Sequence, residues 1–93
     1  MRDYELVFII HPDLDETASN EVIERVKGWI GDNGGEVKKV DLWGKRRLAY
    51  PIRKQNEGQY VLFDLSMDPS FGSQLERSLK LTEPVMRFLL AAK

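Results

Sequence analysis

The chain alternates extended and helical runs in the order βαββαβ, and this order restricts its fold more than any other feature. The extended runs cover residues 4–10, 36–52, 59–67 and 85–91, and the helical runs lie between Asp15 and Asn33 and between Asp68 and Pro84. In 59–67 every second residue is strongly apolar, as in a strand with one buried face. In the helical runs apolar residues recur every three to four positions, as on one buried face of a helix.

This order predicts an α+β, ferredoxin-like fold, in which two helices cover one face of a four-stranded antiparallel sheet. Ninety-three residues suffice for one such unit, so residues 1–93 are expected to form a single domain. Right-handed crossovers give the strand order 4-1-3-2. Run 4–10 is apolar on both faces from Leu6 onward, as in a central strand. Pro51 lacks an N–H donor, which indicates that run 36–52 lies at an edge.

Polar residues and glycines are expected to delimit the helices. Asp15 or Thr17 can cap the first helix, and the residues at 33–35, Asn-Gly-Gly, are expected to end it. Asp68 can cap the second helix, with Pro69 in the first helical position, where a missing N–H costs nothing. Each helix is therefore predicted to have a defined start.

The segment from Gly44 to Lys54 is the clearest sign of a binding partner. It contains five cations and no carboxylate in a chain of net charge −1, so the other residues together carry −6. Concentrated lysines and arginines are typical of phosphate contact with a nucleic acid, and a solvated hairpin is the alternative. Gly44 is expected to form a bulge or bend, and residues 53–58 are expected to close a hairpin. The apolar residues between the charges are Leu48, Ala49, Tyr50 and Ile52.

The sheet face left uncovered by the helices is expected to be unusually apolar. If Leu6 and Phe63 face the helices, the opposite face carries Val7, Ile9, Tyr60, Leu62 and Leu89. Such a surface favours a protein partner, although scattered exposed aliphatic residues are an alternative. Base stacking on the sheet, as in RNA recognition motifs, is disfavoured because Tyr60 alone is a weak platform. Trp43 either anchors a partner or packs on the hairpin.

Residues suited to catalysis or metal binding are few. The absence of cysteine excludes disulfides and thiolate zinc sites, and His11 is expected to have a local role beside Pro12. Asp13, Asp15 and Glu16 suit a helix start and lack the spacing of a calcium loop. We therefore expect no enzymatic activity, no cofactor and no metal. No apolar run approaches the ~20 residues of a membrane span, and no signal peptide is evident, so a cytoplasmic location is expected.

Four short motifs stand out along the chain. They are Arg2-x-Tyr4-Glu5, Pro12-x-Leu14-Asp15, residues 34–40, and the string Arg-Arg-Leu-Ala-Tyr-Pro-Ile from Arg46 to Ile52 with Lys54 after it. With these motifs, its length and its element order, the chain resembles the family of the sixth protein of the bacterial small ribosomal subunit. The resemblance implies a structural protein that binds the central domain of small-subunit ribosomal RNA, together with the eighteenth protein of that subunit as a heterodimer.

The resemblance also implies roles for particular residues. RNA contact is implied for Arg2, Arg46, Arg47, Lys54 and Arg87, and charge proximity adds Lys45 and Arg53. A protein interface is implied for Tyr50, Pro51, Ile52 and Tyr60, and the apolar pattern adds Trp43, Leu48 and Leu62. Asp3 stands where some relatives carry a second basic residue, so the RNA contact near the N-terminus is expected to be weaker here. Met86 stands where relatives can carry another arginine.

Two other functions fit the same topology. A small-molecule regulatory domain, such as an amino-acid sensor, would need a ligand pocket and would have no use for Arg46 and Arg47. An independent binder of single-stranded RNA would need Tyr60 to stack on a base. The acidic net charge favours joint binding instead, with weak RNA affinity for the chain alone and tight, salt-sensitive binding with a basic partner.

Overall fold

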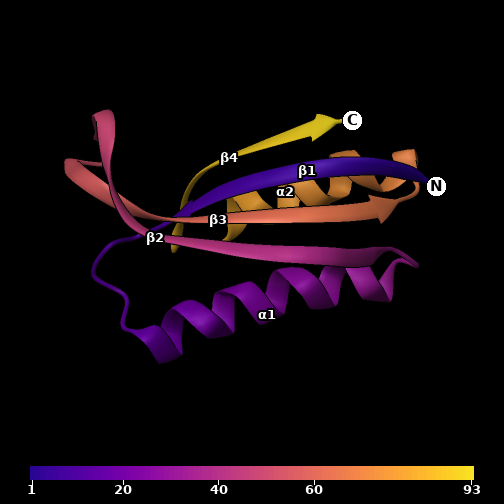
Figure 1. Ribbon diagram of the computed structural model, residues 1–93, viewed down its shortest axis with the longest axis horizontal. Coiled ribbons are helices and arrows are strands. Elements are labelled where there is room, and N and C mark those ends of the chain that lie inside the picture. Colours follow the sequence, from indigo (N-terminus) through magenta and orange to yellow (C-terminus); the bar gives the residue numbers. More distant parts are fainter.

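The computed structural model describes all 93 residues, and its four-stranded sheet has the predicted topology (Figure 1). The elements are β1 (Arg2–Ile10), α1 (Glu16–Asp32), β2 (Glu36–Ile52), β3 (Gln55–Met67), a 3₁₀ turn η1 (Pro69–Phe71), α2 (Gly72–Leu81) and β4 (Val85–Ala92). Neighbouring strands are antiparallel and lie in the order β2-β3-β1-β4. This is the expected order, so the ferredoxin-like fold is confirmed, with β1 and β3 central and the Pro51-containing strand at an edge.

Both helices pack on one face of the sheet and enclose the main hydrophobic core. Leu6, Phe8 and Phe63 are fully buried on this face, as the alternation predicts. The rings of Phe8 and Phe63 are perpendicular with centroids 5.2 Å apart, an arrangement that aromatic pairs prefer. The helices contribute Val22, Ile23, Val26, Ile30, Leu75 and Leu79. Trp29 is half-buried and packs against this core, as expected from its place on the apolar stripe.

The two helices begin in different ways. Asp15 is the cap of α1, because its Oδ1 accepts the backbone N–H of Ala18 at 2.8 Å. Asp68 accepts the N–H of Ser70 at 2.9 Å, but the turn that it caps is 3₁₀, and the α-helix proper begins only at Gly72. The expected start at Pro69 is therefore three residues early. The cap already closes an i to i+3 bond, from Phe71 N–H to the Asp68 carbonyl at 3.0 Å, which is the 3₁₀ pattern.

The β2–β3 hairpin is longer, and its turn tighter, than the sequence predicts. We expected residues 53–58 to connect the strands, but β3 begins at Gln55, which pairs with Ile52. The two turn residues, Arg53 and Lys54, have φ of 50° and 65°, and a type I′ turn requires positive φ at both. Residues 55–57 lie past the end of β1, so they pair with β2 without the apolar alternation by which a strand is recognised.

Lys54→Gly is expected to stabilise the fold by about 1 kcal/mol, because glycine adopts positive φ without the steric penalty of a Cβ. The measurement is the free energy of unfolding in urea. Arg53→Gly is the matched control: it relieves the same backbone strain but removes a side chain that makes hydrogen bonds, so its gain should be smaller or negative. A loss of stability in Lys54→Gly would contradict the positive φ of this turn.

Candidate nucleic-acid interface

The basic segment forms the outer half of the β2–β3 hairpin, which projects past the end of β1. Gly44 has φ of +72° at a break in the β2–β3 register, as expected for a bulge. A second break lies between Arg47 and Ile52, where β2 has more residues between its paired positions than β3 has. In Figure 1 the hairpin continues beyond the left-hand end of the sheet and bends away from α1. The cations therefore lie on an arm outside the core.

Most of the predicted RNA-binding cations on this arm have no carboxylate partner. Lys45, Arg46, Arg47 and Lys54 are exposed, and none forms an ion pair. Arg2 is not near them: it pairs with Met67 at the other end of β1, while the hairpin begins beyond Ile10. Eight residues of strand separate these ends, roughly 26 Å. The structure thus gathers four free cations and leaves Arg2 apart.

Trp43, at the bulge, contacts an aromatic ring and a cation. Its ring is nearly parallel to that of Tyr60, with 12° between the planes and 6.0 Å between the centroids. The guanidinium carbon of Arg46 lies 5.4 Å from the centre of the Trp43 ring, within range of a cation–π interaction. Trp43 therefore packs on the hairpin and is also 43% exposed. Both alternatives for Trp43 remain compatible with this position.

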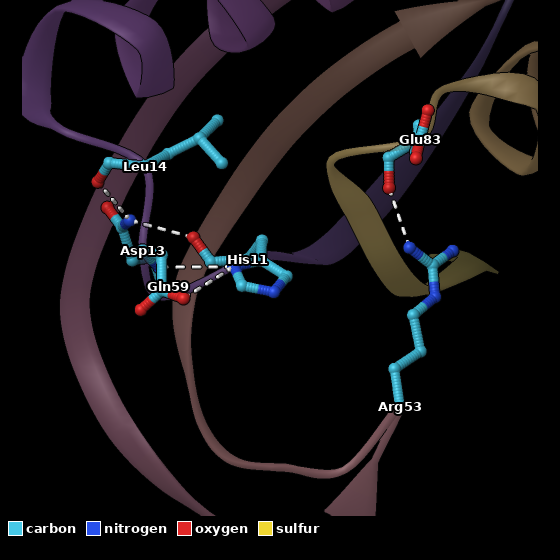
Figure 2. Close-up of polar contacts among 6 residues, drawn as sticks. All are labelled: His11, Asp13, Leu14, Arg53, Gln59 and Glu83. Carbon is cyan, nitrogen blue, oxygen red and sulfur yellow. Dashed lines mark hydrogen bonds and ion pairs between the residues drawn. The ribbon is translucent and has the colours of Figure 1, made fainter.

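Two other predicted cations are engaged within the chain. Arg53 donates from Nη1 to the Glu83 carbonyl at 2.7 Å and from Nη2 to the Val85 carbonyl at 3.2 Å (Figure 2). Arg87 lies over the Tyr50 ring, 5.4 Å from its centroid, and donates a hydrogen bond to the Tyr50 hydroxyl. These contacts connect the tip of the hairpin to the first residues of β4.

A second, small hydrophobic cluster lies under the hairpin on the uncovered sheet face. Leu48, Ile9 and Met86 are each at most 9% exposed, and Ile52 and Tyr60 pack against them. Leu48, a predicted partner residue, thus contacts its own chain. The alternation of side chains along β4 does not predict that Met86 is buried in this cluster. The residue lies at a bulge, because Ile9 pairs with Arg87 while Ile10 pairs with Val85.

The other predicted partner residues have solvent-accessible surface. Tyr50 is 54% exposed and Pro51 is exposed, whereas Leu62 is half-buried in the middle of the uncovered face. Leu62 pairs with Val7, and Val7 pairs with Leu89 across β1, so the three form an apolar row across the sheet. Leu89, which is 66% exposed, was expected on this face but was not assigned to the interface.

Charged residues border the far end of this face. Asp3 accepts hydrogen bonds from the Ser66 hydroxyl and from Lys38 Nζ, and Lys93 Nζ lies 2.6 Å from Asp64 Oδ1. The hydrogen bond from Ser66, followed by that from Lys38, lowers the pKa of Asp3 below its usual 3.8. The bond to Asp64 raises the pKa of Lys93. These side-chain pairs connect four segments at this end of the sheet: β1, the first half of β2, β3 and the C-terminal end of β4.

Asp3→Asn is expected to reduce the acid sensitivity of the fold. A lowered folded-state pKa stabilises the protein above about pH 3.8, and that contribution is lost as the pH falls through the lower folded value. Urea unfolding from pH 6 down to pH 2.5 should therefore show a smaller loss in the variant below pH 4. Ser66→Ala, which removes the largest cause of the shift, should have the same effect. Identical acid slopes in wild type and both variants would contradict it.

His11 takes part in a local network at the junction of β1 and α1. Its Nδ1 accepts the backbone N–H of Asp13 at 3.1 Å, and Gln59 Nε2 donates to the carbonyls of His11 and Leu14, both at 3.1 Å (Figure 2). No group of three or more histidine, cysteine, aspartate or glutamate side chains is arranged to hold a metal ion. Neither helix has the length and apolar character that crossing a membrane requires.

Comparison with known proteins identifies the family. The sequence profile of the family described as Ribosomal protein S6 matches residues 3–91. The chain belongs to this family. It is 49% identical to the small ribosomal subunit protein bS6 of Clostridium novyi over 90 residues, which cover 97% of this chain and 95% of that protein. It is 47% identical to the bS6 of Moorella thermoacetica over 90 residues, 97% and 92% of the two chains.

The S6 fold matches as well as the sequence. The crystal structure of 30S ribosomal protein S6 from Thermotoga maritima superposes with a TM-score of 0.94 at 33% identity, covering 99% of this chain and 87% of that one. The resemblance inferred from the motifs is thereby confirmed. The expectation of a non-catalytic protein agrees with the family, whose matched members are small-subunit ribosomal proteins. Membership in S6 disfavours the alternative of an amino-acid sensor.

Proposed function

We propose that this chain binds the central domain of small-subunit ribosomal RNA jointly with the eighteenth protein of the subunit. The observation that supports this proposal is that the chain has two chemically distinct surfaces. One is a hairpin arm with free cations, and the other is an apolar row across the uncovered sheet face. The two adjoin at Trp43 and Tyr60. One chain can therefore present phosphate-binding groups and a protein-binding surface side by side.

The RNA side of the proposal rests on unpaired charge. Lys45, Arg46, Arg47 and Lys54 have no carboxylate partner, so phosphate oxygens can take all of their donors. Glu57, opposite Arg47 in the register, is the one carboxylate on the arm. Phosphate contacts of this kind position the protein on the RNA but do not distinguish one base sequence from another. We also assign Arg2 and Arg87 to RNA, at the two ends of the sheet.

The partner side rests on exposed apolar surface and on charge. Four side chains on or beside the uncovered face retain solvent-accessible area: those of Tyr50, Pro51, Tyr60 and Leu62. Trp43 can anchor a partner at the edge of this face. Apart from the basic segment the chain is acidic, which suits a basic protein. Leu48 and Ile52 take part in this interface indirectly, by supporting the hairpin from below.

A gel-shift titration of a central-domain ribosomal RNA fragment tests the proposal. The chain alone should bind weakly, and adding the partner protein should tighten binding at least tenfold, with a steep dependence on salt. An unrelated RNA of equal length is the control and should gain no such increase. Equal affinity with and without the partner would contradict joint binding. Loss of partner-independent binding in Tyr60→Ala would instead favour base stacking on the sheet.

A further inference from the structure

We propose that Arg53 is a positioning residue, which fastens the hairpin tip to the start of β4 and so sets the direction of Arg46, Arg47 and Lys54. This inference rests on the proposed RNA binding and deepens it. It also reassigns a cation that charge proximity alone places at the RNA. The observation behind it is a difference between neighbours: Arg53 is hydrogen-bonded within the chain and Lys54, in the same turn, is free.

The Arg53 contacts fix the orientation of the side chain. Its two terminal nitrogens donate to two different carbonyls, those of Glu83 and Val85, which are 30 and 32 residues away in the sequence. Figure 2 shows the guanidinium extending from the hairpin turn to the corner before β4. The planar group has its donors in a fixed fork, so two bonds of this kind determine both its position and its plane. A phosphate could take these donors only by displacing both carbonyls.

The corner that receives Arg53 is itself held in place. The Pro84 carbonyl accepts the backbone N–H of His11 at 2.9 Å, and Val85 N–H donates to the Thr82 carbonyl at 3.0 Å. Val85 is 3% exposed and pairs with Ile10 of β1. The hairpin tip is therefore attached at two points, to the turn before β4 through Glu83 and to β4 itself through Val85, and both points are held by backbone hydrogen bonds or strand pairing.

Two further contacts run in the same direction. Leu48 packs on Ile9 and Met86, and the Tyr50 hydroxyl accepts a hydrogen bond from Arg87. Leu48, Tyr50 and Arg53 thus attach successive points of the arm to β1 and β4. Between Arg46 and Gly58 the two strands of the arm pair only with each other, and the break in register between Arg47 and Ile52 weakens that pairing. The attachments supply the rigidity that the arm itself lacks.

Three variants test this role: Arg53→Ala, Arg53→Lys and, as matched control, Lys54→Ala. All of these side chains carry a Cβ, so the positive φ of the turn is equally strained in each. In the free protein, Arg53→Ala should speed amide hydrogen exchange at the hairpin tip at least tenfold, and Lys54→Ala should not change it. Arg53→Lys should behave like Arg53→Ala, because one ammonium group cannot reproduce the two bonds.

RNA binding with the partner protein, measured over a series of salt concentrations, gives the second readout. Arg53→Ala should lower affinity about three- to tenfold without changing the salt slope, whereas Lys54→Ala should reduce the slope by about 1. A reduced slope in Arg53→Ala, or full rescue by Arg53→Lys, would overturn the positioning role. So would faster exchange with unchanged affinity. If the wild type binds no RNA, the proposed function fails, and unchanged exchange in Arg53→Ala would then separately refute the fastening.

Discussion

Replacing Arg46 and Arg47 together by alanine is expected to weaken assembly onto ribosomal RNA by roughly 30- to 100-fold while leaving the fold intact. Both side chains are exposed on the arm and have no carboxylate partner, so the folded chain loses no ion pair. A phosphate contact of about 1.4 kcal/mol corresponds to tenfold in affinity for each arginine. The logarithmic salt slope should fall by about 2, since each contact releases about one counterion.

The matched control removes two arginines from elsewhere on the surface. Arg25 of α1 and Arg77 of α2 are exposed on the helices, away from the hairpin. Arg25→Ala with Arg77→Ala changes the net charge equally, and its salt slope should match that of the wild type. Thermal unfolding of both double variants checks that neither is misfolded. Equal slopes for the two double variants would mean that RNA senses the total charge of the chain and not the arm.

The fold was predictable where burial on one face imposes a period. Residues 59–67 alternate because Val61, Phe63 and Leu65 touch the helices, and a one-residue slip would expose all three. The hairpin tip carries no such pattern. Its length and its two-residue turn depend on backbone pairing past the end of β1, to which the side chains of residues 55–57 contribute little signal. The 3₁₀ start before α2 likewise depends on the bond closed by Asp68.

The site was predictable as a region but not residue by residue. From sequence alone, five cations in eleven residues predict a basic segment suited to phosphate contact. Whether a cation is available for a partner depends on contacts with residues about 30 positions away. Arg53 donates hydrogen bonds to the carbonyls of Glu83 and Val85, whereas Lys54 forms no hydrogen bond or ion pair. The burial of Leu48 likewise depends on Met86, whose position is set by a bulge in the pairing of β4 with β1. The spacing of residues along one strand does not predict such contacts between distant segments.

Gly58→Ala is expected to destabilise the fold by about 2–3 kcal/mol, near the upper end of the cost of overpacking. A Cβ on Gly58 would overlap Ile9 Cγ2 and touch Leu48 Cδ2 at 3.7 Å. Ile9 is branched at Cβ, which restricts rotation of its Cγ2 methyl, and it is 8% exposed, so it has little room to move aside. A shift of about 4–8 °C per kcal/mol applies to a domain of this size, so thermal unfolding should show a drop of roughly 8–24 °C.

Gly28→Ala provides the opposite expectation for the same chemical change. Gly28 lies inside α1 with nothing within 4 Å of the added methyl, so alanine should stabilise the helix by about 0.5–1 kcal/mol. Combining Gly58→Ala with Ile9→Ala separates overlap from backbone effects: if the clash with Ile9 is the cause, the double variant loses less than the sum of the two single losses. Strict additivity would show that the cost arises from the backbone of Gly58 and not from the close packing beneath the hairpin.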